Sequence, residues 1–230
     1  MRRAKLPKLT VAGPDSYPVS SHVCIGALDS VPKQVLLELF YETLRMGAGT
    51  VTLLEDKSAV LFSDLLADRL DIVVTNHLPL ISGRTRLHTR LLARVTVSIY
   101  GTKKFAHLKT NFPQSLSHQP LIAPTAHSKL RYDMERFFEN HHIQARVIGQ
   151  TQDTGLQRLL GIRGLGLVAL ADFTTRELVS ANRLVKLGTL KGVTEELWLA
   201  SPRERGTNPI AARLMEEYSL KSIMAPVKPR

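Results

Sequence analysis

The sequence predicts an α/β protein with two stacked lobes, and three observations support that fold class. Residues 23–76 alternate between two patterns in the order strand, helix, strand, helix, strand. Residues 101–190 repeat this alternation in the second half of the chain. The chain has 230 residues, 43% of them hydrophobic, which is enough for two small domains that each bury a core. Strands that alternate with helices are typical of open, parallel sheets.

The first unit of this pattern is a strand, a turn and a helix. The apolar run at 23–28 predicts a buried strand, and Pro32 is suited to open a helix that continues to about residue 46. Asp29 or Ser30 is expected to cap that helix. A strand that leads into a helix N-terminus favours an anion or a small polar ligand, but an ordinary strand–helix unit with a good cap has the same pattern.

Two further strands complete the first sheet. Residues 50–55 predict a strand, and residues 57–70 have apolar side chains at helical spacing. Residues 71–75 predict the third strand. Right-handed crossovers make the three strands parallel, and parallel sheets bind ligands at the carboxyl ends of their strands. Those ends are residues 28–31 and 75–77.

A basic, alternating segment follows. The pattern at 84–94 is that of a half-buried strand, with one face formed by Arg84, Arg86, His88, Arg90 and Arg94. That face is either an ordinary solvated surface or a positive rim for an anion or a partner. Residues 95–100 are apolar and predict another strand, which Gly101 ends.

The second half is expected to contain the second lobe. Its predicted elements are a short helix from 103 to about 111, a strand at 120–124, a helix at 128–142, a strand at 146–149, a helix at 156–164, a strand at 166–170, a helix at 171–181, strands at 184–190 and 195–201, and a last helix at 209–218.

The net charge of +11 is concentrated at the two ends of the chain. Residues 1–21 carry four basic side chains and one acidic one, and residues 221–230 carry three basic ones and no acid. The middle of the chain therefore holds only +5, which is too weak to indicate a nucleic-acid-binding domain. We interpret residues 1–21 as a linker remnant and residues 221–230 as a loose tail. No secretory signal or membrane span is visible, so we expect a cytoplasmic protein without a membrane partner.

Many weak features, in their order and spacing, resemble one known family. From about residue 23 to 218 the chain resembles the effector-binding (substrate-binding) domain of LysR-type transcriptional regulators. The segments that carry this resemblance are 27–33 (ALDSVPK), 65–74 (LLADRLDIVV) and Tyr100-Gly101. Residues 121–124, 128–130 and 193–196 resemble more narrowly the branch of the sodium/proton-antiporter activator, NhaR.

The resemblance implies a periplasmic-binding-protein-like fold of type II. Two Rossmann-like lobes would be joined by two crossover strands, near residues 95–101 and 195–201. Lobe I would comprise 22–99 plus 196–220, and lobe II would comprise 100–195. The sensor hypothesis requires a cleft between the lobes; a single continuous sheet, or side chains that fill the gap completely, would contradict it.

An effector of this family binds between the lobes, which places the candidate binding residues. The resemblance implies contacts from Ser30, Val31, Thr125, Ser128, Thr151 and Asp153. Asp29, Asn76 and Asp153 are the oxygen donors expected near the cleft if the effector is sodium rather than a polar or anionic molecule. The sequence indicates neither a cofactor nor a set of metal ligands.

The expected partners are an effector and further copies of the chain. The helix at 32–46 has more apolar side chains than one sheet can cover, which suggests a homodimer or homotetramer. The resemblance implies that this helix packs against the helix at 128–142 of the partner. The family's winged helix-turn-helix is absent from this sequence, so DNA contact would require that domain, and the chain is either an excised sensor domain or a truncated product.

Two other function classes fit the sequence less well. A solute-binding protein of the periplasmic type would have the same fold, but no signal peptide is visible. An enzyme is disfavoured because His141 and His142 have no paired carboxylate or cysteine nearby and no Ser/His/Asp order or phosphate-binding glycine loop is present.

Overall fold

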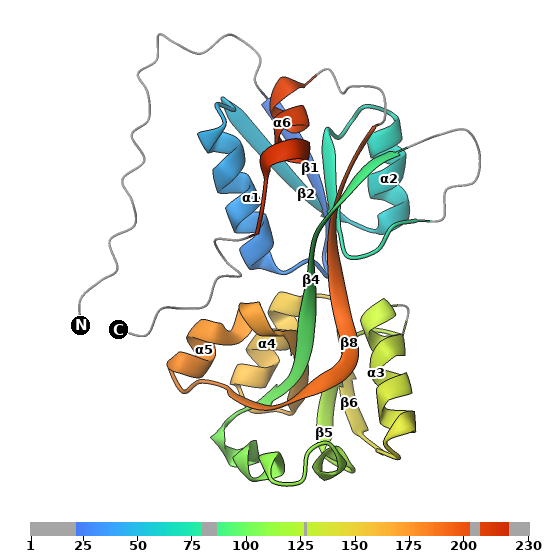
Figure 1. Ribbon diagram of the computed structural model, residues 1–230, viewed down its shortest axis with the longest axis vertical. Helices are drawn as coiled ribbons and strands as arrows, with labels where there is room; N and C mark the ends of the chain where they lie inside the picture. Colours follow the sequence, from blue (N-terminus) through green and yellow to red (C-terminus); the bar gives the residue numbers. More distant parts are fainter. Residues whose placement is uncertain (1–21, 80–86, 127, 203–207, 221–230) are drawn as a thin grey trace.

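The computed structural model describes residues 22–79, 87–126, 128–202 and 208–220. It has the mixed α/β fold that the sequence predicts, with two lobes joined at a waist (Figure 1). The upper lobe in that view, lobe I, contains α1, α2 and α6, and the lower lobe, lobe II, contains α3, α4 and α5. The predictions for Arg84, Arg86 and the two tails concern residues outside the described part of the chain.

The elements follow the order that the sequence predicts. They are β1 (His22–Leu28), α1 (Lys33–Arg45), β2 (Thr50–Asp56), α2 (Ser58–Leu66), β3 (Ile72–Thr75), β4 (Leu87–Gly101), the 3₁₀ helices η1 (Lys103–Lys109) and η2 (Gln114–Leu116), β5 (Pro120–Ala123), α3 (Lys129–Asn140), β6 (Arg146–Gln150), α4 (Thr154–Ile162), β7 (Leu167–Ala171), η3 (Asp172–Thr175), α5 (Arg176–Ser180), β8 (Val185–Pro202) and α6 (Pro209–Glu217).

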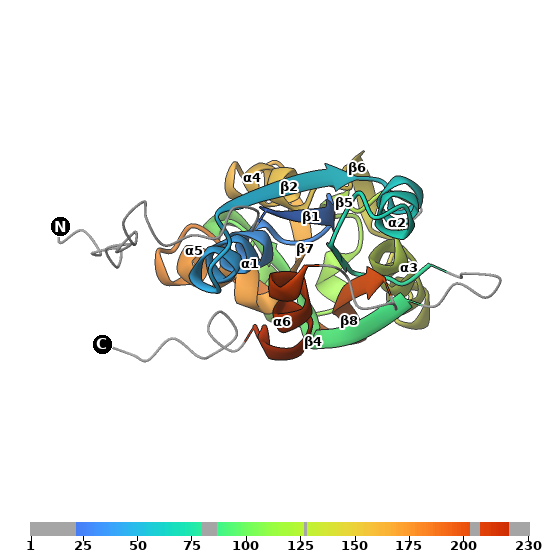
Figure 2. The same cartoon turned by 90° about the horizontal axis from the view of Figure 1, so that it is seen from above.

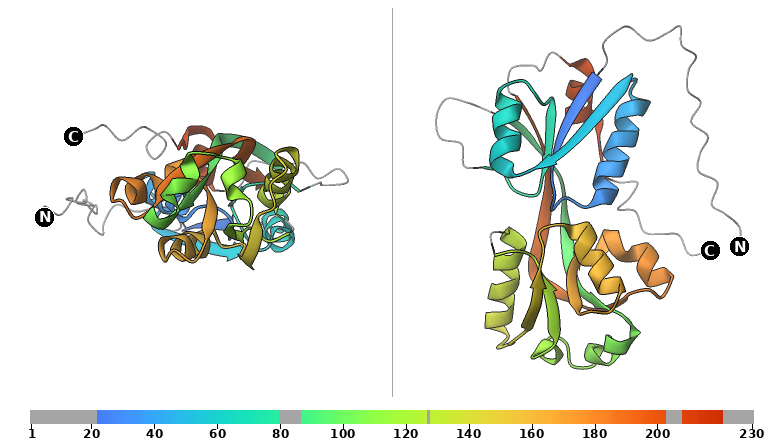
Figure 3. Two further views of the ribbon diagram at one scale, coloured as in Figure 1. Left: turned by 90° about the horizontal axis from the view of Figure 1, so that it is seen from below. Right: turned by 180° about the vertical axis from the view of Figure 1, so that it is seen from behind.

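Lobe I is organised around β1. This strand pairs in parallel with β2 and with β3, which confirms the predicted parallel sheet. Helices α1 and α2 lie on opposite sides of the sheet (Figures 2 and 3). Ile25, Leu39 and Leu65 are fully buried between these layers. The C-terminal α6 returns to the same core through Leu214 and Tyr218, as expected from the resemblance.

Two long strands form the waist. The sequence predicted four separate strands here, whereas β4 has 15 residues, β8 has 18, and the two pair antiparallel along nearly their whole length. Strand β4 continues because Arg94 and Val95 both pair with β8, whereas β8 passes through an unpaired bulge at 190–193. Register shifts in the pairing, including one between Leu91 and Ala93, absorb the irregular spacing.

The same pair joins the two sheets into one. Hydrogen bonding links all eight strands in the order β2-β1-β3-β8-β4-β7-β5-β6. The single continuous sheet that the sequence analysis named as evidence against a sensor is therefore present, because β3 pairs with β8 and β7 pairs with β4. The lobes nevertheless keep separate hydrophobic cores on either side of the waist. A continuous hydrogen-bonded sheet thus does not exclude a cleft in a fold whose crossover strands belong to both lobes.

Lobe II packs helices on a parallel arrangement of β7, β5 and β6. The apolar stripe predicted for α3 is buried, and it consists of Leu130, Met134, Phe137 and Phe138. His141 ends this helix and stacks on Phe137 with 4.1 Å between the ring centroids. The helix predicted at 171–181 is divided into η3 and the short α5.

Two helix ends differ from the predictions. The cap residue of α1 is Pro32, and neither Asp29 nor Ser30 accepts a capping hydrogen bond from the first backbone amides of the helix. Helix α2 ends at Leu66 rather than at residue 70, because Asp68 adopts a φ of 56°. The amides after that reversal donate back to the carbonyl of Asp64, which replaces the helical hydrogen bonds.

Two arginines on the basic face of β4 form hydrogen bonds to other elements of the fold. Arg90 donates to the carbonyls of Leu214 and Tyr218 and so fixes the end of α6. Arg94 donates to Glu196 on β8 over 2.7 Å. None of the described helices is long and apolar enough to cross a membrane.

We expect Gly188→Ala to destabilise the protein. A methyl group at Gly188 on β8 would overlap the ring of Phe112, and such overpacking costs about 1–3 kcal/mol in the free energy of unfolding. Urea denaturation measures this change. Gly149→Ala on β6 is the matched control, because a methyl group there meets nothing within 4 Å and should change stability by less than about 0.5 kcal/mol. Equal stabilities of the two variants would contradict the close packing of Phe112 on Gly188.

Candidate functional site

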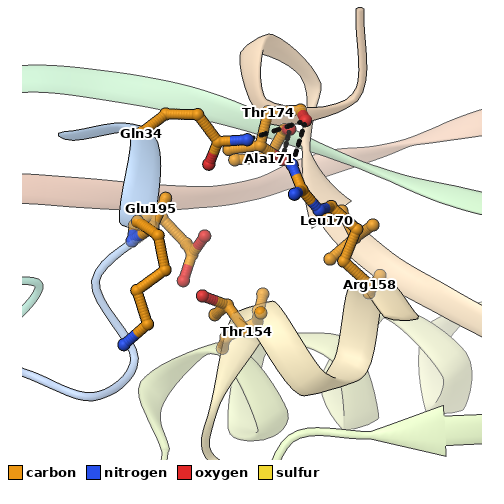
Figure 4. A pocket seen from close by; sticks show the side chains of 12 residues that line it. Gln34, Thr154, Arg158, Leu170, Ala171, Thr174 and Glu195 are labelled. Carbon is orange, nitrogen blue, oxygen red and sulfur yellow. Dashed lines mark hydrogen bonds between the residues drawn. The ribbon is translucent and has the colours of Figure 1, made fainter. Parts of the chain in front are cut away.

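A narrow cleft lies where the lobes meet. Its volume is about 30 Å³, and it is closed by α1 from lobe I, by α4 and β7 from lobe II, and by β8 (Figure 4). Its lining residues are Pro32, Lys33, Gln34, Leu130, Thr154, Gly155, Arg158, Ala169, Leu170, Ala171, Thr174 and Glu195. A space of this size holds one or two water molecules, so a metabolite can enter only if the lobes or their side chains move apart.

Besides the contact of Asn76 with Glu195, two hydrogen bonds connect the lobes at this cleft. The Gln152 side chain, after β6, donates to Asp29, after β1, over 2.6 Å. The Gln34 side chain on α1 donates to the carbonyl of Thr174 over 3.4 Å. The first bond is exposed and the second is long, so each contributes modestly. Together they join the two lobes only weakly.

The two helices that begin at the cleft present different N-termini. No described side chain caps α1, so its first turn keeps backbone N–H groups and a positive partial charge for a ligand. Helix α4 is capped by Asp153, whose carboxylate accepts from the amides of Gly155 and Leu156. Of these two helices, only α1 therefore has an N-terminus without a side-chain cap.

Glu195 on β8 is the buried acid of the cleft. Only 8% of the residue is exposed, although it carries a carboxyl group. Burial raises the pKa of Glu195 to about 7, and a hydrogen bond from Asn76 and the charge of Lys129 oppose this rise. Figure 4 shows its carboxylate pointing toward Thr154 on α4. At neutral pH this group is poised between its charged and neutral forms.

Arg158 on α4 supplies the opposite charge. Its Nη1 donates to the carbonyl of Thr174 at 3.5 Å, and its buried Nε has no hydrogen-bond partner among the described residues. The preceding Gln157 donates to the carbonyl of Ile122 over 3.0 Å and anchors this turn of the helix on β5. The guanidinium group reaches toward Thr174, which also lines the cleft (Figure 4), and its Nε–H remains an unused hydrogen-bond donor.

The predicted binding residues surround this cavity rather than line it. Asp29 bonds Gln152, and Asn76 bonds the ring of His77 over 3.0 Å and acts on Glu195. Ser30 lies partly buried in the turn between β1 and α1, and the Val31 side chain is fully buried in the core of lobe I. In lobe II the Thr125 carbonyl accepts from the amide of Ser128, the Ser128 side chain caps α3, and Thr151 accepts from the amide of Asp153, which caps α4. The cavity is lined by residues next to these in the chain, such as Lys33 and Thr154.

Sequence reasoning missed Glu195 and Arg158. Two consecutive acids in a strand indicate a buried carboxyl group, because successive side chains point to opposite faces and one of Glu195 and Glu196 must point inward. Arg158 lies one helical turn after Thr154 and therefore on the same face of α4 as the start of the helix. Neither argument depends on coordinates, but both require the strand and helix boundaries to be known.

The structure gathers no metal-ligand cluster. Within the described residues, no three His, Cys, Asp or Glu side chains lie close enough to hold a metal ion. The oxygens expected for sodium, on Asp29, Asn76 and Asp153, each engage a different partner. A hollow of about 290 Å³ lies elsewhere, between α3 and β6, but its Arg131 already pairs with Glu135 and it holds no buried, unpaired charge. The cleft between the lobes is therefore the better candidate site.

Comparison with known proteins gives one family. The family described as LysR substrate binding domain matches residues 18–219. The HTH-type transcriptional regulator TtuA from Agrobacterium vitis is 29% identical over 181 residues, which are 74% of this chain and 57% of that protein. The chain therefore spans little more than half the length of this curated relative.

Solved structures show the same fold. The regulatory domain of HypT from Salmonella typhimurium, in its apo form, matches with a TM-score of 0.69 and 14% identity over 87% of this chain and 94% of that one. The regulatory domain of CcmR from Synechocystis PCC6803, in complex with 2-PG, matches with a TM-score of 0.63 and 14% identity over 89% and 96% of the two chains.

We expect Glu195→Gln to be more stabilising at high pH than at low pH. The pKa of Glu195 is raised from 4.5 to about 7, so the unfolded chain ionises this carboxyl first and the wild type loses stability as pH rises between these values. Relative to the wild type, the variant should gain roughly 2–3 kcal/mol between about pH 5 and pH 7.5. Urea denaturation at both pH values measures the change.

Glu196→Gln is the control for this measurement. Hydrogen bonding to Arg94 lowers the pKa of Glu196, so its carboxylate stabilises the fold as pH rises, and its loss should not produce a gain at high pH. The same pH response in both variants would show that Glu195 is not the buried acid described here.

Proposed function

Because the chain belongs to the LysR substrate-binding domain family, we propose that it is the effector-sensing domain of a LysR-type bacterial transcriptional regulator. The observation that supports this most is a cleft lined from both lobes, in which Gln34 of lobe I faces Arg158 and Thr174 of lobe II. A ligand that contacts both lobes changes the balance between their open and closed positions.

The effector would be a small polar molecule or ion. The uncapped first turn of α1 and the guanidinium of Arg158 favour an anionic group, and the carboxylate of Glu195 favours a cation or a hydrogen-bond donor. The matched CcmR domain was solved with 2-PG, which supports a small ligand for a domain of this fold. Asp29, Ser30, Val31, Asn76, Thr125, Ser128, Thr151 and Asp153 remain proposed contacts for a ligand that opens the cleft.

Control of DNA binding would come from a separate domain. The relative TtuA is an HTH-type regulator, and we propose that this chain acts in the same way with a helix-turn-helix in the whole protein. Such a regulator works in the cytoplasm and is not an enzyme. We retain the division into 22–99 plus 196–220 and 100–195, and the narrower assignment to the NhaR branch, as proposals. A periplasmic solute-binding protein remains the alternative, since it shares the fold.

Self-association is the second part of the proposal. Leu37 on α1 is 65% exposed, and Phe40 lies beside it on the same helix. In lobe II most of the exposed large apolar side chains lie on β6 and α4, including Ile148 and Leu159, whereas α3 exposes only Tyr132 among its large apolar residues. This favours α1 packing against the β6–α4 edge of a second copy, rather than against α3 as the sequence analysis expected.

A thermal-shift screen of small acids, amino acids and salts tests effector binding. A ligand at 100 times its dissociation constant stabilises the folded protein by about 2.7 kcal/mol, which is a clear rise in Tm. Thr154→Phe should abolish the rise, because Thr154 lies in the cavity lining and points toward Glu195.

Thr110→Phe is the matched control, since this exposed threonine lies outside the cavity lining. It should respond as the wild type does. A stabilising ligand that acts equally on the wild type and on Thr154→Phe binds outside the cleft and would contradict the proposal, as would a folded protein that no compound stabilises.

Sedimentation analysis tests the association surface. We expect Leu37→Glu and Leu159→Glu each to weaken self-association at least tenfold, because a charge buried at the centre of an interface costs more than about 1.4 kcal/mol. Tyr132→Glu on α3 should leave the oligomer unchanged. Loss of association in Tyr132→Glu alone would instead support the pairing of α1 with α3.

A further inference from the structure

Two opposite charges face the closed cleft without pairing with each other. Glu195 on β8 and Arg158 on α4 both line the cavity, yet no ion pair joins them among the described residues. Glu195 is nearly buried, and the Nε of Arg158 is buried with no hydrogen-bond partner. The Glu195 carboxylate has a hydrogen bond from Asn76 but no ion pair, whereas the Arg158 Nε has no hydrogen-bond partner at all among the described residues. Buried polar groups are almost always satisfied in native proteins, so an unpaired carboxylate and an unpartnered donor at one cavity point to a ligand that completes them.

The neighbouring charges are already engaged. Lys33 on α1 pairs with Glu55, and Lys129 on α3 pairs with Asp133. Arg94 on β4 pairs with Glu196, on the other face of β8. Asn76, the residue that follows β3, contacts Glu195 with its neutral side-chain amide. None of these ion pairs neutralises Glu195 directly, and none satisfies Arg158.

We propose that the cleft ligand is a small zwitterion, whose ammonium group binds Glu195 and whose carboxylate binds Arg158. This inference rests on the proposed sensing function and specifies its ligand class. The hydroxyl of Thr154, which faces Glu195, is placed to accept or donate a hydrogen bond between the two charged ends.

Singly charged ligands suit the cleft less well. A simple anion at Arg158 would lie in a narrow, partly dehydrated space close to the Glu195 carboxylate, which repels it. A simple cation at Glu195 would leave the Arg158 Nε without a partner. A zwitterion adds no net charge to the closed cleft and gives each buried group a partner of opposite sign, which lowers the cost of removing both from water.

The protonation of Glu195 supports the same ligand. Burial raises its pKa to about 7, so at neutral pH a substantial fraction of the molecules carry a neutral carboxyl group. An ammonium group in contact would favour the charged form. Binding should therefore release protons near neutral pH, an effect that an anion bound at Arg158 alone would not produce.

Calorimetry with five probes tests this inference. The probes are acetate, methylammonium, glycine, β-alanine and 4-aminobutyrate, the last three of which place the two charges at increasing separation. We expect at least one amino acid to bind about tenfold or more tightly than acetate or methylammonium. Glu195→Gln and Arg158→Gln should each weaken its binding about tenfold or more, and Glu195→Gln should also abolish the proton release seen by comparing two buffers at pH 7.

Glu196→Gln and Arg163→Gln are the matched controls, on the same strand and helix but outside the cavity lining, and both should bind as the wild type does. In one contrary outcome, acetate or methylammonium binds as tightly as the amino acids, and either cleft variant abolishes that binding. The proposal of a zwitterionic ligand is then wrong, while the cleft remains the sensing site. If none of the five probes binds, the inference is also overturned; the sensing function is then decided separately by the Thr154→Phe screen.

Discussion

The antiparallel pairing of β4 with β8 is the constraint on which the rest of the structure depends. These two strands are the waist between the lobes, and each contributes hydrogen bonds to strands of one lobe at its end: β8 to β3, and β4 to β7. Because both strands continue through the waist, the lobes can change their relative angle only by bending or twisting this pair. The position of the cleft follows directly, since it lies beside Glu195 at the point where β8 passes between the lobes.

The closed cleft has an energetic consequence. Its own interlobe hydrogen bonds, Gln152 to Asp29 and Gln34 to Thr174, are exposed or long and hold the lobes only weakly. At the same place, burial raises the pKa of Glu195, and the Arg158 Nε has no hydrogen-bond partner among the described residues. A domain with weak closing contacts and strong ligand-directed groups is suited to sensing, because the ligand's contacts with both lobes then decide the equilibrium between open and closed states.

The hydrophobic pattern of the sequence predicted much of this fold, but neither the two long strands of the waist nor the charged residues that line the cleft. The strand–helix alternation of lobe I was readable because each element has its own periodicity and its own ending signal, as at β1 and α1. The length of β8 was not readable, since Gly192 interrupts the pattern and lies in a bulge at 190–193 that has no partner on β4, and the pairing continues on both sides of this bulge. The eight predicted contacts surround the cavity because strand ends can be located from sequence, whereas the inward direction of Glu195 or Arg158 depends on register.

The distance between the lobes, measured with and without a stabilising ligand, tests the central claim most directly. Spin labels at Ala67→Cys after α2 and Asn140→Cys at the end of α3, in a Cys24→Ser background, report on lobes I and II. The account predicts a change in the distance distribution when a cleft ligand binds, because a cleft of about 30 Å³ must widen to hold it, and no change in Thr154→Phe. A single distance that no bound ligand changes would contradict a sensor whose two lobes move about the β4–β8 pair.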